Sequence, residues 1–367
     1  MEYLVSVIVP VYNSEKYILE TLESVKKQTL GFENIQLIIV DDCSTDYSFQ
    51  TVKEWAAGCS NVVLTQTDTN SGSPALPRNI GLDLAVAPYI MFLDNDDMYT
   101  DSACKVLYDT ALNTGADIVS GDSELMESDI RFTEEEKTRL LWHTETIQAG
   151  EHSLKEEIGD WIVPFLNNHW CKIYKREIIE KNKIRSLPGE IWEDILFLFL
   201  YLSVSEKCVY IKEPIVQYRA RKESLSHVQG EAFYCSIPKS MNYGKERADE
   251  LGTTDQYLSF VNYGFGIVEY YLDELLSNKK LDKEALERCV LAWAKPFEYC
   301  GSGNCQLHSA YGRILSDDMK RNEPQQAVFH FFELKRLYLQ RKEELDEIFN
   351  SKTYKLAQLI GKIVRHR

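Results

Sequence analysis

The first hundred residues alternate short apolar runs with segments whose apolar positions recur every three or four residues. Four runs are almost continuously apolar, as expected of strands buried on both faces, and they span residues 4–10, 35–40, 62–64 and 89–93. The segments between them predict helices, the first of which places Ile18, Leu22 and Val25 on one face. This alternation predicts an α/β fold with a doubly wound, mostly parallel sheet.

The fourth run ends abruptly in carboxylates, with Asp94 and Asp96 on either side of Asn95. A buried carboxylate is unfavourable unless it is paired or bound to a metal, whereas an open α/β sheet binds ligands at the carboxyl ends of its strands. Mg²⁺ and similar cations are held by one or two carboxylates together with substrate phosphates. The pair therefore fits a metal-bound nucleoside diphosphate. The alternative is an Asx-type turn that leads into a helix near Asp101.

Two further strand ends carry candidate ligands for a nucleobase. Tyr12 lies just beyond the first strand, where its ring could stack on a base, and Asp41 and Asp42 follow the second strand. Either carboxylate could accept the N3–H of uracil, a donor that cytosine lacks. We favour Asp42, although the sequence does not separate the two. The alternative is that both cap a helix beginning near Thr45.

Asn70 and Arg78 flank a loop that contains Gly72, Pro74 and Pro77. Arg78 is expected near the start of a helix, a position that already favours phosphate. The guanidinium fork could clamp diphosphate or sugar oxygens. The alternative is a salt bridge with a surface carboxylate.

Taken in order, these motifs resemble those of family 2 glycosyltransferases, which are inverting, metal-dependent enzymes with the GT-A fold. The resemblance covers about the first 220 residues and includes the motifs at residues 7–13, 40–46, 72–79, 94–97 and 192–194. The version of the motif at residues 71–79 is similar to bacterial enzymes that decorate wall teichoic acids and capsules. Those enzymes typically use a UDP-sugar such as UDP-N-acetylglucosamine, and a UDP-hexose is the other expected donor.

The resemblance also implies roles for single residues. Pro10, Tyr12 and one of the two aspartates after the second strand would line the base pocket. Asp94, next to Asn95, would contact the ribose or sugar hydroxyls of the donor. Asp96 would bind the metal, Mn²⁺ or Mg²⁺, with Asp94 as the second carboxylate beside it.

An inverting transfer needs a base that deprotonates the acceptor hydroxyl on the face opposite the leaving group. Glu193 and Asp194 open an apolar helix over residues 195–201. We expect Asp194 to be the base, with Glu193 as the fallback. The alternative is that both carboxylates only stabilise the N-terminus of this helix.

A compact basic cluster lies in a predicted loop at residues 218–224 and includes Arg219, Arg221 and Ser224. In similar enzymes a loop at this place folds over the diphosphate when the donor binds and excludes water. We therefore expect the three residues to contact the donor. The segment must also serve as the linker to the next domain.

The expected domains are a GT-A domain (Rossmann-like, mostly parallel sheet) at 1–225, a mainly helical domain at 226–350 and a tail helix at 351–367. The helical domain carries no catalytic motif, and we expect it to shape the acceptor side or a homo-oligomer. The tail combines an apolar stripe with basic residues, which is typical of a helix that lies on a membrane surface. Its alternative is docking on the protein's own surface.

Composition narrows the classes of partner and compartment. A net charge of −16 excludes nucleic acid as the main partner, since phosphate backbones need a basic surface. The nine cysteines are scattered without C-x-x-C spacing, which indicates reduced thiols. The sequence shows no signal peptide and no apolar run of transmembrane length. We expect a cytoplasmic protein, peripheral on the inner face of the membrane, whose acceptor is a glycan, a polyol-phosphate or a lipid-linked precursor.

Two other functional classes remain open at the sequence level. A sugar nucleotidyltransferase would also use an α/β sheet, a metal and a nucleotide, but it should carry a Gly-rich signature near the first strand, where Pro10-Val11-Tyr12-Asn13 stands. A non-catalytic protein that binds sugar nucleotides or glycans is the other class. The intact acidic residues argue against it.

Overall fold

A computed structural model describes most of the first 220 residues and part of the remainder. The described residues are 2–126, 148–154, 162, 165, 169–220, 230–263, 275, 280–293, 296, 326, 330–333, 335 and 336. Two predicted site residues, Arg221 and Ser224, and the predicted tail helix at 351–367 lie outside this part of the chain.

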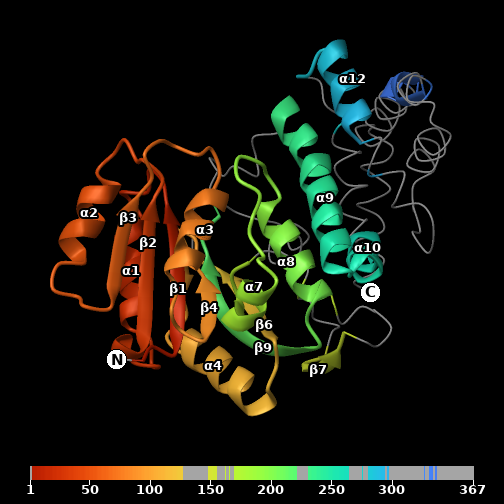
Figure 1. Ribbon diagram of the computed structural model, residues 1–367. Coiled ribbons are helices and arrows are strands. Elements are labelled where there is room, and N and C mark those ends of the chain that lie inside the picture. Colours follow the sequence, from red (N-terminus) through yellow and green to blue (C-terminus); the bar gives the residue numbers. More distant parts are fainter. Residues whose placement is uncertain are drawn as a thin grey trace, which may run out of the picture. The chain divides into compact units, whose positions relative to one another are not determined.

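The chain forms a mixed sheet whose first half is parallel. Its strands lie in the order β3 (Val62–Gln66), β2 (Ile35–Asp41), β1 (Val5–Val11), β4 (Tyr89–Phe92), β8 (Lys172–Lys175), β6 (Ile118–Leu125), β9 (Lys207–Tyr218) and β5 (Met98–Tyr99), and β7 (Gly150–Ser153) pairs with β9. Figure 1 shows β3, β2, β1 and β4 side by side in this order. Because β2 and β4 flank β1 on opposite sides, the strand order reverses at β1 and β4, and such switch points bind ligands.

Helices cover the sheet and connect its strands. Before residue 229 the α-helices among the described residues are α1 (Ile18–Lys26), α2 (Ser48–Trp55), α3 (Ala75–Leu84), α4 (Ala103–Thr114), α7 (Arg176–Lys181) and α8 (Glu193–Ser203). The strands contribute alternate residues to the two faces of the sheet. Val5, Val7 and Val9 of β1 join one core with α1 and α4. On the other face α3 packs on β1 and β2, and a Cβ on Gly81 would overlap the side chain of Ile8. This close approach fixes the helix that carries Arg78.

The predicted α/β class and the first four strands are confirmed, and the differences lie in the second half of the sheet. There β8 runs antiparallel between β4 and β6, so the parallel pattern is interrupted. The sequence pattern gave no strand at β5 or β7. The first of these has only two residues, and the second, Gly-Glu-His-Ser, has no apolar alternation.

Contacts divide the chain into two compact units. One comprises Met1–Val228 and Lys239–Val261, and the other comprises Gln229–Pro238 and Asn262–Arg367. After residue 228 the described elements are the helices α9 (Glu231–Leu251), α10 (Thr254–Tyr263) and α12 (Lys283–Ala292). Within the described residues no helix combines the length and the apolar composition that crossing a membrane requires.

Candidate active site

The candidate site lies where β1, β2 and β4 end together. Pro10 pairs with Val40 near the ends of β1 and β2, and Tyr12 follows with 44% of its surface exposed. The backbone N–H of Leu93 donates to the carbonyl of Ile8 at 3.1 Å, which continues the pairing of β4 with β1 up to Asp94. The register of the sheet thus brings the predicted base and donor residues to one edge.

Asp41 and Asp42 are both buried, but their carboxylates have different partners. Both oxygens of Asp42 accept hydrogen bonds, Oδ1 from the Thr67 hydroxyl at 2.9 Å and Oδ2 from the Ser71 N–H and hydroxyl at 2.9 and 2.8 Å. Asp41 uses only Oδ2, which accepts from the Ser44 N–H and the Gln66 amide. Its Oδ1 is buried without a hydrogen-bond partner among the described residues. Such an oxygen is open to a donor from a ligand.

The alternative that Asp41 and Asp42 cap α2 is wrong. The helix begins at Ser48, beyond the predicted start near Thr45, and the carboxylate that accepts the Ser48 N–H is Asp46 Oδ1, at 2.9 Å. Asp41 and Asp42 instead shape the loop between β2 and the helix, where Cys43 adopts a left-handed backbone with φ of 58°.

Asn70 also shapes its own loop. Its side-chain oxygen accepts the Gly72 N–H at 2.9 Å, and its amide donates to the Asp42 carbonyl at 3.3 Å. Sequence reasoning named Asn70 but missed Ser71 and Thr67. The position of Ser71 between Asn70 and Gly72 was the available signal, because loops with these residues often bond back to a nearby carboxylate.

Arg78 lies at the centre of an acidic cluster. Its Nη1 donates to Glu193 Oε1 and its Nη2 donates to Asp94 Oδ1, both at 2.7 Å. The side chains of Arg78 and Glu193 are 5% and 9% exposed, whereas that of Asp94 is 32% exposed. The partners are therefore two predicted site residues. Nε of Arg78 is buried without a partner among the described residues.

Burial and mutual repulsion shift the protonation of this cluster. Burial, followed by the charge of Asp194, raises the pKa of Glu193 to about 7, although Arg78 opposes the shift. Burial likewise raises the pKa of Asp194 above its usual value, against the effect of Arg78. For Arg78, burial alone would lower the pKa, but the charges of Asp94, Glu193 and Asp194 outweigh it and raise the pKa. The guanidinium stays charged, and the two carboxylates of α8 hold protons more tightly than exposed ones.

The N-terminus of α8 is held in a strained conformation. Trp192, directly before Glu193, has a left-handed φ of 72°, which is costly for a bulky side chain. The Ser240 hydroxyl donates to the Ile191 carbonyl at 2.8 Å and fixes the chain just before the turn. Asp194 remains partly exposed, and its Oδ1 accepts the Ile195 N–H at 2.8 Å. The turn therefore separates a buried Glu193 from a more accessible Asp194.

Arg219, the residue directly after β9, holds the Asp94–Asp97 loop in place. The backbone N–H of Arg219 donates to Asp97 Oδ1 at 2.8 Å, and its Nε donates to the Asp96 carbonyl at 2.9 Å. Asp97 is buried. Asn95 and Asp96 are partly exposed on the same loop.

Sequence reasoning assigned no role to two buried polar residues close to Arg78 and Asp194, namely Lys172 and His169. Lys172 is fully buried on β8, and burial lowers its pKa to about 8, although the charge of Asp194 opposes this. Burial also lowers the pKa of His169, whose ring packs between Phe92 and Phe197. Trp170 is 8% exposed and belongs to the core, stacked on Tyr218.

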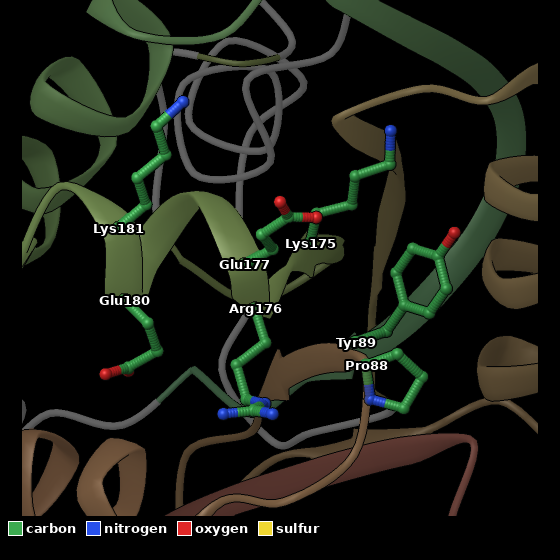
Figure 2. A pocket seen from close by; sticks show the side chains of 7 residues that line it. All are labelled: Pro88, Tyr89, Lys175, Arg176, Glu177, Glu180 and Lys181. Atoms are coloured by element: carbon green, nitrogen blue, oxygen red, sulfur yellow. The ribbon is translucent and has the colours of Figure 1, made fainter.

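The structure also contains a cavity away from this edge. It has a volume of about 520 Å³ and is lined by Pro88, Tyr89, Lys175, Arg176, Glu177, Glu180 and Lys181 (Figure 2). Tyr89 begins β4 and pairs with Lys175, so the cavity lies at the end of β4 opposite to Asp94. None of the predicted site residues lines it.

The chain matches a known family over its first half. Residues 6–182 match the model of the family described as "Glycosyl transferase family 2". The match is consistent with the sequence resemblance and covers the strands from β1 to β8. It ends before α8, so Glu193 and Asp194 lie outside it.

Curated relatives and a solved structure show the same likeness. The minor teichoic acid biosynthesis protein GgaB of Bacillus subtilis is 31% identical over 62% of this chain and 24% of its own length. The poly(ribitol-phosphate) beta-N-acetylglucosaminyltransferase TarS of Staphylococcus aureus is 43% identical over 27% of this chain and 17% of its own length. The chain thus spans a quarter or less of these relatives. The crystal structure of S. aureus TarS 1-349 in complex with UDP-GlcNAc shares the fold of this chain, with a TM-score of 0.70 at 21% sequence identity. The match covers 91% of this chain and 92% of the TarS chain.

Proposed function

We infer that this chain, a glycosyltransferase of family 2 by the match over residues 6–182, moves a sugar from a UDP-sugar to an acceptor hydroxyl of a cell-envelope polymer. The observation that carries this proposal is the pairing of Arg78 with Asp94 on one side and Glu193 on the other. It joins the carboxylates after β4 to the acidic pair that begins α8. A donor side and a candidate base thus meet at the sheet edge that binds ligands in this architecture.

The base pocket favours uracil. The exposed ring of Tyr12 offers a stacking surface, and the unpartnered Oδ1 of Asp41 can accept N3–H. Asp42 remains the other acceptor, since a carboxylate oxygen can take a second hydrogen bond. Its bonds to Thr67 and Ser71 give it a further task, which is to hold the loop before Arg78.

Asp94 and Asp96 would hold the divalent cation, Mn²⁺ or Mg²⁺. The donor set fits, because two carboxylates on one short, partly exposed loop suit a hard cation that takes its other ligands from phosphates and water. When bound, the cation would offset the charge of the diphosphate and help UDP to leave. Asp94 would also contact the donor sugar, next to Arg78.

Asp194 is the proposed base in a single displacement that inverts the anomeric carbon. It is the more exposed of the acidic pair, and its raised pKa makes it a stronger proton acceptor than an ordinary aspartate. Glu193 is less suited, because it is buried and one of its oxygens is bound to Arg78. Glu193 would instead fix Arg78 against the donor side.

The relatives suggest the substrate class. The TarS structure is a complex with UDP-GlcNAc, and TarS is named a poly(ribitol-phosphate) beta-N-acetylglucosaminyltransferase. We therefore propose a UDP-hexose or UDP-N-acetylhexosamine donor and a polyol-phosphate or related glycan acceptor. An acceptor of this kind is consistent with a cytoplasmic enzyme working at the inner membrane surface.

The test compares wild type with Asp194→Asn, using UDP-N-acetylglucosamine, Mn²⁺ and poly(ribitol-phosphate). The variant keeps size and polarity but cannot accept a proton, so transfer should fall by roughly 10²–10⁴-fold. UDP affinity measured by calorimetry should be unchanged, because the proposed UDP contacts lie on other residues. The product of the wild type should have inverted configuration by NMR.

Asp83→Asn is the matched control, since Asp83 is an exposed carboxylate paired with Arg185 outside the site. It should keep the full rate. A full rate in Asp194→Asn would move the base to Glu193. Retained configuration in the product would overturn the single displacement.

A further inference from the structure

Arg219 binds the carboxylate loop through its backbone and its side chain. The Asp97 carboxylate accepts its N–H at 2.8 Å and the Asp96 carbonyl accepts its Nε–H at 2.9 Å. These contacts join residues more than 120 positions apart in the sequence, at the end of β9. Arg219 therefore touches the peptide of the proposed metal ligand.

The rest of the guanidinium is held by α1. Its Nη2 donates to Glu20 Oε2 at 2.6 Å, and its central carbon lies 5.0 Å from the centre of the Tyr17 ring. Tyr17, the N-cap of α1, lies one helical turn before Glu20, and α1 packs against β5, the strand directly after the loop. The arginine thus bridges a rigid helix and the carboxylate loop.

The likeness to similar enzymes led us to expect that Arg219 contacts the donor. In the structure, however, two of its side-chain N–H groups are already engaged by the protein. Only arginine presents such groups in a fixed fork, whereas lysine has a single ammonium that cannot reach both acceptors in the same geometry. A carboxylate that binds a metal must be held within about half an ångström of its place, and its backbone sets that place.

We propose that Arg219 is a positioning residue for Asp96, and that Glu20 and Tyr17 hold Arg219 in the conformation that does so. This role rests on the proposed function, since it concerns the ligand of the cation that binds with UDP. It adds Glu20 of α1 and Tyr17, the N-cap of that helix, to the residues on which metal affinity depends. Neither of them lies near the carboxylate loop in the sequence.

The experiment measures UDP binding by calorimetry with Mn²⁺ and, separately, with EDTA. Arg219→Lys should weaken the Mn²⁺-dependent binding by about 10–100-fold, the usual effect of losing a partner of a metal ligand. Glu20→Gln should act in the same direction by a smaller factor, because glutamine still accepts a hydrogen bond. Binding in EDTA should be unchanged in both variants. Arg185→Lys, which alters a partly exposed arginine paired with Asp83 and Glu180 outside the site, is the control and should bind like wild type.

Direct contact of Arg219 with phosphate would give a different pattern. Affinity would then fall in EDTA as well, and Glu20→Gln would have no effect, which would overturn the proposal.

A second readout needs no ligand. Amide hydrogen exchange over residues 94–99 should be faster in Arg219→Lys and Glu20→Gln than in wild type and Arg185→Lys. Unchanged exchange would overturn the positioning role. If the wild type bound no UDP while both variants still exchanged faster than the wild type, the proposed function would be overturned. The role of Arg219 in holding the loop would remain supported.

Discussion

The charge balance around Arg78 dominates the candidate site at the scale of single residues. One buried guanidinium faces three carboxylates, those of Asp94, Glu193 and Asp194. Only two of them are bound to it directly, and Glu193 is almost fully buried. Because a single positive charge cannot compensate three negative ones in a desolvated place, Glu193 holds its proton up to a pKa of about 7, and the pKa of Asp194 also lies above its usual value. The site therefore couples its charge state to pH.

This coupling predicts a pH-dependent loss of stability that depends on Glu193. Below its usual pKa of 4.5, the folded and unfolded chains both carry the proton. Between 4.5 and about 7 only the unfolded chain ionises, so the free energy of unfolding falls as pH rises and the loss is complete above about 7. Glu193→Gln cannot ionise and should lack this part of the decline. Melting temperatures of both proteins at pH 5, 6, 7 and 8 test this.

The expected result is a wild type that loses more stability over this range than the variant. Asp194 also has a raised pKa, and because it is present in both proteins both curves keep a contribution from its titration. Glu177→Gln, at an exposed position of α7, should follow the wild-type curve. Parallel curves for Glu193→Gln and wild type would contradict the assignment.

The residue types of the site could be predicted from the sequence, but their partners could not. Carboxylates after a buried strand point to a ligand on chemical grounds alone, which singled out Asp94 and Asp96. The bond from Arg78 to Glu193 spans 115 positions, and no local pattern encodes it. The same holds for Arg219, whose bonds to Asp96 and Glu20 form only when β9 ends beside α1.

At the scale of elements, the fit of α3 against β1 sets where Arg78 lies. Gly81 is one turn after Arg78 and faces Ile8, with no room for a Cβ. The helix consequently sits closer to the sheet than a larger residue would allow. The side chain of Arg78 can then reach both Asp94 and Glu193.

Gly81→Ala tests this packing. Alanine favours the helix intrinsically, but its methyl group would overlap Ile8 and push α3 outward. The expected net effect is a loss of about 1–3 kcal/mol of stability, as is typical of overpacked cores. Transfer should fall as well, because Arg78 moves with the helix. Denaturant unfolding and the transfer rate are the measurements.

Gly150→Ala is the matched control, since its Cβ would meet only His152 at an ordinary contact distance. It should leave stability within a few tenths of a kcal/mol of wild type. A Gly81→Ala variant as stable and active as the control would show that the contact between α3 and β1 can accommodate a methyl group without moving Arg78.

Some helices and strands could be predicted from their own residues, whereas others depend on residues far away in the sequence. The four parallel strands and the helices between them were predictable, because each carries its own apolar periodicity. The placement of β8 between β4 and β6 was not, since pairing across the sheet depends on residues far apart in the sequence. The segment before the acidic pair gave no signal for the left-handed Trp192, whose strain only tertiary contacts can sustain.

At the scale of the whole molecule, net charge opposes any contact with an anionic membrane. A chain of net charge −16 is repelled by such a surface, so membrane association needs a local basic and apolar segment. The predicted tail helix at 351–367 is the candidate from the sequence. It lies outside the described residues, so the proposal depends on its composition.

Ending the chain at residue 350 should therefore release the protein from anionic vesicles. The tail carries Lys355, Lys362, Arg365 and Arg367 beside an apolar stripe, and each basic residue near an anionic surface contributes about 1 kcal/mol. Co-sedimentation with phosphatidylserine vesicles should fall on truncation and should weaken with salt in the full chain. Transfer to a soluble acceptor should survive. Replacing Lys362 and Arg365 by glutamine keeps the stripe and should lower binding to anionic vesicles but not to neutral ones. Equal binding by the full and shortened chains would show that the tail packs on the protein.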